Sequence, residues 1–309
     1  MRSVRITGVS LVTLTVLLFA SVSVPAHAPT AATAPTVAAL RNLPGRTSLL
    51  VLQNGRQIAA LNADLPRAVG SSFKMALLLT LKKQIQAGRY RWTDVVRIKP
   101  HWKVPGGVLF DWANGMPVTF EALAGFMISV SDNTATDAVM DIVGRENAER
   151  YTGRNRPLLS THDFYFFKDL RHRDWLDRYR RAGLAERRAI VGQVAKMPLD
   201  LANYEEPNGP YALDLEWFFT NRELCGIVAQ IADLDIMGIA TFSANRSDWA
   251  RIAFKGGSEP GVISTTFGLA AKDGRTYCVS ASWNNDRAIV DNTFWEELMK
   301  DLIVRLRGR

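Results

Sequence analysis

The order of hydrophobic and polar residues divides the chain into two strand-forming ends and a helix-forming middle. Five short runs are apolar or alternating in the manner of strands: residues 47–52, 57–61, 252–254, 262–271 and 275–283. Asn54-Gly55 joins the first two runs and Asp273-Gly274 joins the last two, and both dipeptides are typical of hairpin turns. Strands from the two ends of the chain can therefore pair in one antiparallel sheet.

Helical periodicity accounts for most of the other apolar residues. The expected helices cover residues 37–42, 71–87, 119–130, 134–143, 146–151, 175–196 and 294–306, with another opened by a capping box at residues 220–223. Residues 95–110 and 152–171 are predicted to be irregular. The pattern predicts an α+β fold, in which terminal helices flank an antiparallel sheet to form an α/β lobe and the middle of the chain forms an all-α lobe.

The first 28 residues have the pattern of a secretory signal peptide. Arg2 and Arg5 make the start basic, residues 9–24 are apolar apart from Ser and Thr, and Ala26-His27-Ala28 offers small residues at a cleavage site. Because the apolar run is short for a membrane span, we expect cleavage after Ala28 and not an uncleaved anchor. The mature protein is then predicted to be secreted or periplasmic, without stable membrane insertion.

The mature chain is expected to begin with a flexible segment, residues 29–36, followed by a single domain over residues 37–309. A hydrophobic content of 47% and a charged content of 22% suit a soluble protein with a sizeable core. Loss of the two signal arginines lowers the formal net charge from +8 to +6. The remaining positive charge is concentrated at residues 171–188, which favours weak attraction to anionic envelope polymers.

Export argues against nucleic-acid binding, and the histidines give no sign of a metal site. The four histidines, at positions 27, 101, 162 and 172, lack the spacing of metal ligands. We therefore expect no metal and no cofactor, a small-molecule substrate, and a monomer.

Two cysteines, Cys225 and Cys278, are present. In an oxidising compartment they can pair, which requires the helix that carries Cys225 to cross the strand that carries Cys278. We expect buried free thiols, with the disulfide as the alternative.

Ser71 and Lys74 stand at the start of a predicted helix, three residues apart and so on one face. A serine at a helix N-terminus has backbone N–H groups beside it that can hold a developing oxyanion. A neighbouring lysine that is desolvated can lose its proton and act as a base. Taken alone, so short a motif is far more often only an N-cap serine beside a surface lysine, because it recurs by chance.

Three short motifs follow one another along the chain: Ser71-x-x-Lys74, Ser131-Asp132-Asn133 and Lys255-Gly256-Gly257. Their order and structural context resemble those of the penicillin-recognising serine enzymes, and most closely the class A serine β-lactamases. The resemblance covers nearly the whole mature chain and includes the hairpin before Ser71 and the 60-residue interval to Ser131. It implies an α/β lobe and an all-α lobe with the site in the cleft between them.

The resemblance also assigns catalytic roles. Ser71 is the nucleophile, and Lys74, its pKa lowered by burial and by Lys255, is the base or part of its relay. Ser131 stands between the two lysines and passes a proton to the leaving group. Lys255 places positive charge near a substrate carboxylate.

Three further residues are assigned to substrate binding. Asn133 hydrogen-bonds an amide side chain of the substrate, and Gly257 lies in the substrate-binding motif. The backbone N–H groups of Ser71 and Ser258 form the oxyanion hole.

The chain departs from the family pattern at two places. Gly256 stands where the family has Thr or Ser, although Ser258 is able to compensate. Residues 160–169 contain no glutamate, the residue that activates the deacylating water in class A enzymes. Asp163 and Asp169 are alternatives, but each is expected to be a surface or capping carboxylate, and His162 a loop residue.

The expected function is an exported serine hydrolase that forms an acyl-enzyme on Ser71 and opens β-lactams. Two alternatives remain open at this point. One is a serine esterase or D-Ala peptidase that acts on a different substrate. The other is a penicillin-binding or sensing module that does not turn over.

Overall fold

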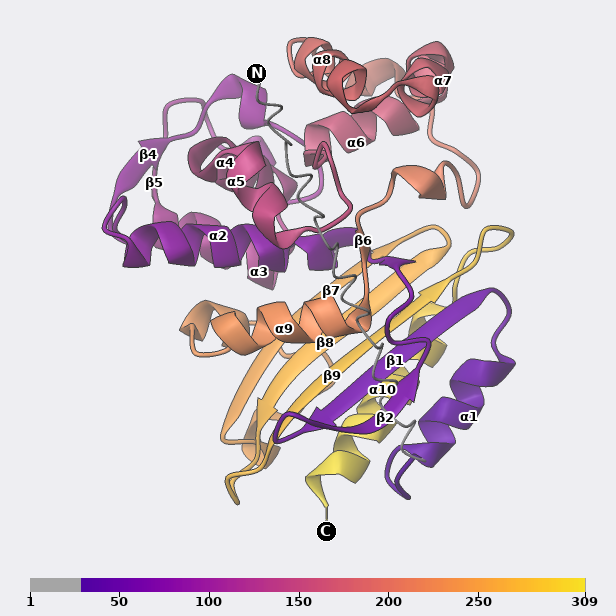
Figure 1. The fold of residues 1–309 in the computed structure, drawn as a ribbon. Coiled ribbons are helices and arrows are strands. Elements are labelled where there is room, and N and C mark those ends of the chain that lie inside the picture. Colours follow the sequence, from indigo (N-terminus) through magenta and orange to yellow (C-terminus); the bar gives the residue numbers. More distant parts are fainter. Residues whose placement is uncertain (1–28, 309) are drawn as a thin grey trace, which may run out of the picture.

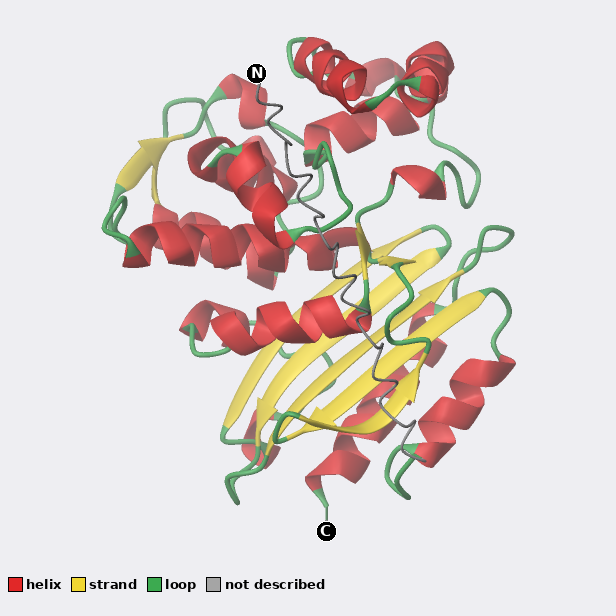
Figure 2. Ribbon diagram, viewed as in Figure 1, coloured by secondary structure: helices red, strands yellow, loops and turns green. Residues whose placement is uncertain are grey.

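The structure of residues 29–308 is a computed structural model, and the predicted signal segment 1–28 lies outside the described residues. One five-stranded antiparallel sheet has the order β2-β1-β9-β8-β7 (Figures 1 and 2). Its strands are β1 (Arg46–Gln53), β2 (Arg56–Leu61), β7 (Arg251–Glu259), β8 (Val262–Ala270) and β9 (Thr276–Asn284). The N-terminal hairpin therefore pairs with the C-terminal strands, as the pattern predicts.

Alternation along the strands gives the sheet two covered faces. Leu49 and Val51 pack with α1 (Ala34–Asn42) and α10 (Asn292–Arg307), whereas Leu50 lies on the other face beside α9 (Asn221–Ile231). Figure 1 shows α9 lying between the sheet and the helices of the middle of the chain, such as α2 (Lys74–Gln86) and α3 (Phe120–Ser129). Helix α1 begins at Ala34, within the segment expected to be flexible, because Pro35 suits the first turn of a helix.

The helical lobe is built around α2 (Lys74–Gln86), whose residues from Lys74 to Lys82 are all buried. Around it lie α3 (Phe120–Ser129), α4 (Asn133–Val143), α5 (Arg145–Ala148) and the short strand pairs β3 (Arg67–Ala68) with β6 (Phe218–Phe219) and β4 (Val95–Arg97) with β5 (Pro117–Thr119). The predicted α+β fold, with a sheet lobe and a helical lobe, is confirmed. Among the described residues no helix is long and apolar enough to cross a membrane.

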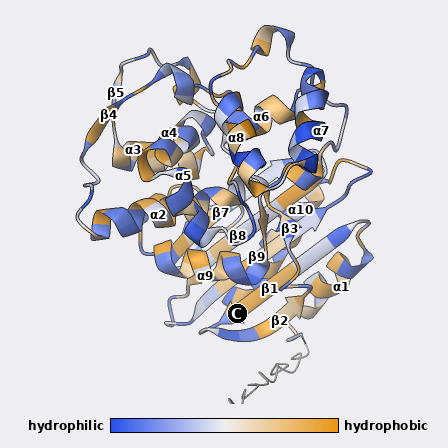
Figure 3. Cartoon of the chain, turned by 45° about the horizontal axis from the view of Figure 1, so that its top comes forward, coloured by the Kyte–Doolittle hydropathy of each residue, from blue (hydrophilic) through white to orange (hydrophobic). Residues whose placement is uncertain are grey.

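The segment after α5 differs from the sequence-based prediction. Residues expected to be irregular contain α6 (Thr161–Lys168), which Ser160 and Asp163 open with a capping box. The single basic helix expected at 175–196 is two helices, α7 (Arg173–Arg181) and α8 (Leu184–Val194), because the chain turns at Ala182-Gly183. These three helices share a small apolar core of their own, and Figure 3 shows the hydrophilic colouring of α7.

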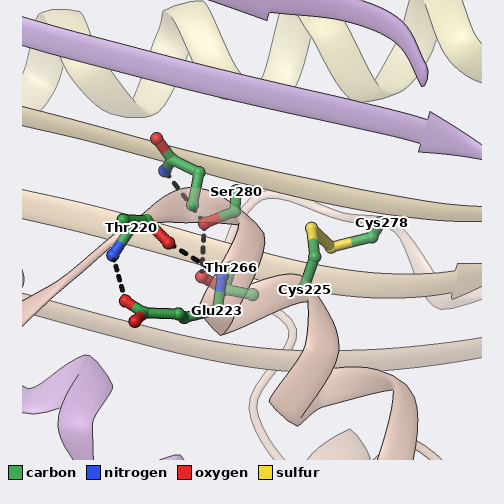
Figure 4. The surroundings of a disulfide bond; sticks show 7 residues. Thr220, Glu223, Cys225, Thr266, Cys278 and Ser280 are labelled. Atoms are coloured by element: carbon green, nitrogen blue, oxygen red, sulfur yellow. Dashed lines mark hydrogen bonds between the residues drawn. A yellow bond between two sulfur atoms is a disulfide. The ribbon is translucent and has the colours of Figure 1, made fainter. Parts of the chain in front are cut away.

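Cys225 and Cys278 form a disulfide, so the expectation of free thiols is wrong. Cys225 is on α9 and Cys278 on β9, and Figure 4 shows the helix lying across the strand at this point. The same helix is fixed one turn earlier, where Asn221 donates a hydrogen bond to Ser280 at 3.0 Å. The crossing that the pairing required is therefore present.

Candidate active site

Ser71 lies on a tight helical turn, residues Gly70–Phe73, that continues directly into α2. Gly70 has φ +48°, a conformation that favours glycine, and it lets the chain turn from β3 into the helix. Phe73 anchors the turn by stacking on Trp217, with ring centroids 4.0 Å apart. The backbone of Val69 donates a hydrogen bond to the Trp217 carbonyl at 3.0 Å, so the turn is held on both sides of Ser71.

Lys74 is fully buried, and its ammonium group is directed at the second motif. Its Nζ donates to the Ser131 carbonyl at 2.6 Å, to Asn133 Oδ1 at 2.8 Å and to Ser131 Oγ at 3.2 Å. Three oxygen acceptors therefore orient the side chain. The first and second motifs, far apart in the chain, meet at this amine.

Ser131 connects the two buried lysines. It has φ +59°, a left-handed conformation that is strained for a residue with a Cβ. In this conformation the hydroxyl lies between the two amines. It accepts a hydrogen bond from Lys74 and a second one, at 2.9 Å, from Lys255 Nζ. Lys255 also donates to the carbonyl of Gly256 at 2.8 Å.

Burial shifts the pKa of both lysines downward. Desolvation, followed by the nearby charge of Lys255, holds the pKa of Lys74 well below its usual value. Burial alone lowers the pKa of Lys255 to about 7. A neutral amine is therefore more accessible at Lys74 than at an exposed lysine, as a base requires, while the charge of Lys255 varies with pH around 7.

The predicted strand stops before the third motif. In the structure, strand β7 continues through Lys255-Gly256-Gly257-Ser258 to Glu259. Its backbone lies against the turn that carries Ser71. A Cβ at Gly257 would overlap the amide nitrogen of Ser71, and a Cβ at Gly70 would lie 3.1 Å from the amide nitrogen of Ser258. The amides assigned to the oxyanion hole therefore stand on two backbones in close contact.

The other assigned binding residue, Asn133, is held at the start of α4. Its Nδ2 donates to the Pro105 carbonyl at 2.7 Å, while its Oδ1 accepts from Lys74. The amide also acts on the hydroxyl of Tyr165, so its donors are directed at neighbouring side chain and backbone oxygens. Ser258 is exposed, on the edge strand β7 of the sheet.

The carboxylates of the 160–170 segment are engaged in structure. Asp163 accepts from the Ser160 amide at 2.9 Å and pairs with Arg145 at 2.9 Å. Asp169 caps the next turn and pairs with Arg171. His162 Nε2 lies 2.9 Å from the Met197 carbonyl. The expected capping role of the two aspartates agrees with this geometry.

The structure adds a set of residues beside the site that sequence reasoning missed. Asp137, on α4, accepts from the amides of Thr161 and His162 and from the Thr161 hydroxyl, and so ties α6 to α4. The sequence did contain an indication of this role, because Asp137 follows Asn133 by four residues and so lies on the same face of the helix. The others are Tyr165, Lys168, Glu216 and Glu259, which are brought together from separate segments.

Comparisons with known proteins bear on the family and the fold of this chain. The family described as "Beta-lactamase enzyme family" matches residues 35–172. A solved β-lactamase from Sphaerobacter thermophilus is 19% identical and superposes with a TM-score of 0.62 over 89% of this chain and 95% of that chain. The structure of PBP-A is 15% identical, with a TM-score of 0.60 over 93% of this chain and 100% of that one.

A class A β-lactamase from Bacteroides cellulosilyticus is 15% identical, with a TM-score of 0.59 over 90% of this chain and 98% of that chain. No curated protein sequence matches this chain. The resemblance to the class A β-lactamase-like serine enzymes is confirmed. In this β-lactamase-like fold, Ser71, Ser131 and Lys255 lie where the helical lobe meets the edge strand β7 of the sheet.

Proposed function

We propose that the protein is an exported active-site serine hydrolase that forms an acyl-enzyme on Ser71, with β-lactam hydrolysis as its reaction. The observation that carries this proposal is the link from Lys74 through Ser131 to Lys255, with hydrogen bonds of 3.2 and 2.9 Å to one hydroxyl. Two buried amines joined by a hydroxyl form a path for a proton, and the strand that carries Lys255 lies against the amide of Ser71.

The proposed acylation begins with attack of Ser71 Oγ on the lactam carbonyl. The serine proton passes to neutral Lys74, and the N–H groups of Ser71 and Ser258 receive the developing oxyanion. When the carbon–nitrogen bond breaks, Ser131 gives its proton to the leaving nitrogen and takes one from Lys74. The substrate carboxylate is held by Lys255 while that lysine is protonated.

Hydrolysis of the acyl-enzyme requires a base that activates a water molecule. The segment 160–169 contains no glutamate, and its two aspartates are engaged with Arg145, Arg171 and backbone amides. These contacts favour slow deacylation, and hence a second candidate function: a penicillin-binding protein that acylates and releases slowly. One similar solved structure is described as a PBP-A mutant in an acyl-enzyme complex with penicillin G.

Intact-mass analysis separates these candidates. The protein is mixed with benzylpenicillin and sampled over time, and turnover of a chromogenic cephalosporin is followed in parallel. A β-lactamase gives turnover and a transient adduct, whereas the second candidate gives a lasting adduct. Ser71→Ala is expected to abolish both signals, and an adduct of equal yield on that variant would refute the proposed nucleophile.

A serine esterase or D-Ala peptidase remains the alternative for substrate. Hydrolysis of simple esters or D-Ala peptides by the wild-type protein, without any adduct from β-lactams, would favour it. The same Ser71→Ala variant serves as the control.

We also propose that residues 1–28 direct export and that the mature protein acts as a monomer. The Cys225–Cys278 disulfide supports an oxidising compartment. Amino-terminal sequencing of the secreted protein should begin at Pro29. Light scattering should report the mass of one mature chain.

A further inference from the structure

A pocket with aromatic and acidic walls lies between α6 and the end of β7. Tyr165 and Lys168 of α6 line one side, Tyr204 and Glu206 another, and Glu259 closes the strand side. The cavity volume is about 130 Å³, which suits a short aminoalkyl chain better than a bulky aromatic group.

The pocket adjoins the candidate active site at two points. The Asn133 amide lies close enough to Tyr165 to act on its pKa, which burial and the charge of Glu206 raise overall. On the opposite wall Glu259 directly follows Ser258. Because side chains alternate along a strand, Lys255, Gly257 and Glu259 lie on one face of β7.

The two charged residues among these three lie at opposite ends of this segment of β7. The cation at Lys255 and the carboxylate at Glu259 are four residues apart, or roughly 13 Å along the strand. Gly257, between them, lies against the amide of Ser71. A substrate that spans the nucleophile along β7 therefore meets the cation of Lys255 at one end and, at the other, the pocket that Glu259 helps to line.

Lys168 does not cancel the negative charge of the pocket. Its Nζ donates to the Tyr211 carbonyl and pairs with Glu259 at 2.9 Å, and it lies 4.8 Å from the centroid of the Phe164 ring. Glu206 is exposed and has no cationic partner among residues 29–308. One lysine is thus matched by one glutamate, and Glu206 is left in excess.

A further carboxyl group lies behind Lys168. Glu216 is 4% exposed, its Oε1 is 3.7 Å from Lys168 Nζ, and within the described part of the chain neither of its oxygens has a hydrogen-bond partner. Burial and the neighbouring Glu259 raise its pKa, so it retains a proton more readily than an exposed glutamate. Glu216 does not line the pocket itself, but its carboxyl group helps to hold Lys168 in the pocket wall.

We propose that this pocket binds a cationic amine carried by the acyl portion of the substrate, so that the substrate is anionic at the Lys255 end and cationic at the Glu206 end. Tyrosine faces and a carboxylate beside an ammonium group are a favourable combination. This inference rests on the proposed acylation of Ser71, whose substrate class it narrows.

A matched pair of penicillins tests the proposal. One is 6-aminopenicillanic acid acylated with 6-aminohexanoic acid, and the other is the same compound with its terminal amine acetylated. In both, the lactam carbon–nitrogen bond breaks, the Ser71 ester forms, and the nitrogen gains a proton. The rate of adduct formation, followed by intact mass, should be about tenfold higher for the free amine.

Variants identify the responsible carboxylate. Glu206→Gln should bring the ratio of the two rates close to one, whereas Glu205→Gln, an exposed neighbour outside the pocket lining, should leave the ratio as in wild type. Equal rates for the two penicillins in the wild type would overturn the proposal. A ratio that falls equally in both variants would also overturn it, because it would indicate only long-range attraction of the amine to any nearby carboxylate.

A binding measurement separates failure of this inference from failure of the proposed function. If neither penicillin forms an adduct, the proposed function fails, and Nα-acetyl-lysine methylamide is titrated against the protein by calorimetry. Binding that Glu206→Gln weakens and Nε-acetylation abolishes would support the pocket. Absence of binding would show that Lys168 already fills the cationic place, and would overturn the inference.

Discussion

At the scale of single residues, the site depends on two lysines whose charges are costly to bury. Lys74 is fully buried and Lys255 is 3% exposed, and both are oriented by oxygen acceptors around Ser131. Two like charges in one buried cluster disfavour each other, so protonation of one amine opposes protonation of the other. This is the electrostatic basis of the proposed division of roles, with Lys74 as the base and Lys255 as the cation that binds a carboxylate.

The pH dependence of substrate recognition should report Lys255. Its pKa of about 7 means that it is charged below that pH and neutral above it. The kcat/KM for a penicillin, relative to its methyl ester, should therefore fall as the pH rises through about 7, because only the free acid benefits from the charge. The ratio of the two kcat/KM values cancels the effect of Lys74 ionisation, because both compounds need the same base. A ratio that stays constant from about pH 6 to 9 would contradict this assignment.

At the scale of elements, the contact between β7 and the turn that carries Ser71 forms the proposed oxyanion hole. Gly257 permits this contact because it lacks a Cβ. Gly257→Ala should push the strand away and lower the acylation rate by about a hundredfold or more, the effect of losing an oxyanion-hole donor. Stopped-flow acylation measures the loss. Gly226→Ala, where a Cβ meets open space, is the control and should acylate normally.

The junction of α4 and α6 is a second element-scale contact. Asp137 accepts three hydrogen bonds, at 2.6, 2.8 and 2.9 Å, from the first turn of α6. Asp137→Ala should lower the free energy of unfolding by about 2–3 kcal/mol, since buried donors lose a charged acceptor. Urea unfolding measures the change. Asp174→Ala, at an exposed position of α7, should change stability little, and an equal loss there would refute the explanation.

At the scale of the whole molecule, α9 connects the helical lobe to the sheet. It packs with α2 in one core and is bonded to β9 by the disulfide. Because Ser131 comes from the helical lobe and Lys255 from the sheet, the candidate site requires the two lobes to keep their relative positions. The disulfide holds α9, which lies between the two lobes, against strand β9 of the sheet.

Removal of the disulfide should lower stability substantially. It closes a segment of 53 residues, for which about 4 kcal/mol is expected. The double variant Cys225→Ala/Cys278→Ala should unfold roughly 10 °C below wild type, by thermal scanning under non-reducing conditions. Reductant should lower the Tm of the wild type and leave that of the double variant unchanged. A wild type insensitive to reductant would argue against the bond.

The strands, most helices and the three motifs were predictable because each depends on residues close in sequence. Hairpin dipeptides such as Asn54-Gly55 and caps such as Thr220 act over a few positions, and the structure contains both features. Helix α6 was missed although Ser160 and Asp163 form a capping box, because its aromatic residues lack a clear helical period. The extent of β7 was missed because glycines weaken a strand pattern, and here pairing with β8 maintains the strand.

The sequence by itself determined the local structure, the order of the motifs and the chemistry that Ser71, Lys74 and Lys255 are able to perform. Only the tertiary structure decided that Cys225 meets Cys278 and that Lys168 pairs with Glu259, 91 residues away. The position of Ser131 between two amines was expected from the resemblance alone, and its hydrogen bond with Lys255 is a contact of the folded chain. The physical reason is that period, caps and turns are local interactions. Which distant side chains share a buried space depends on how whole elements pack, and that packing also sets the desolvation that lowers the pKa of the lysines.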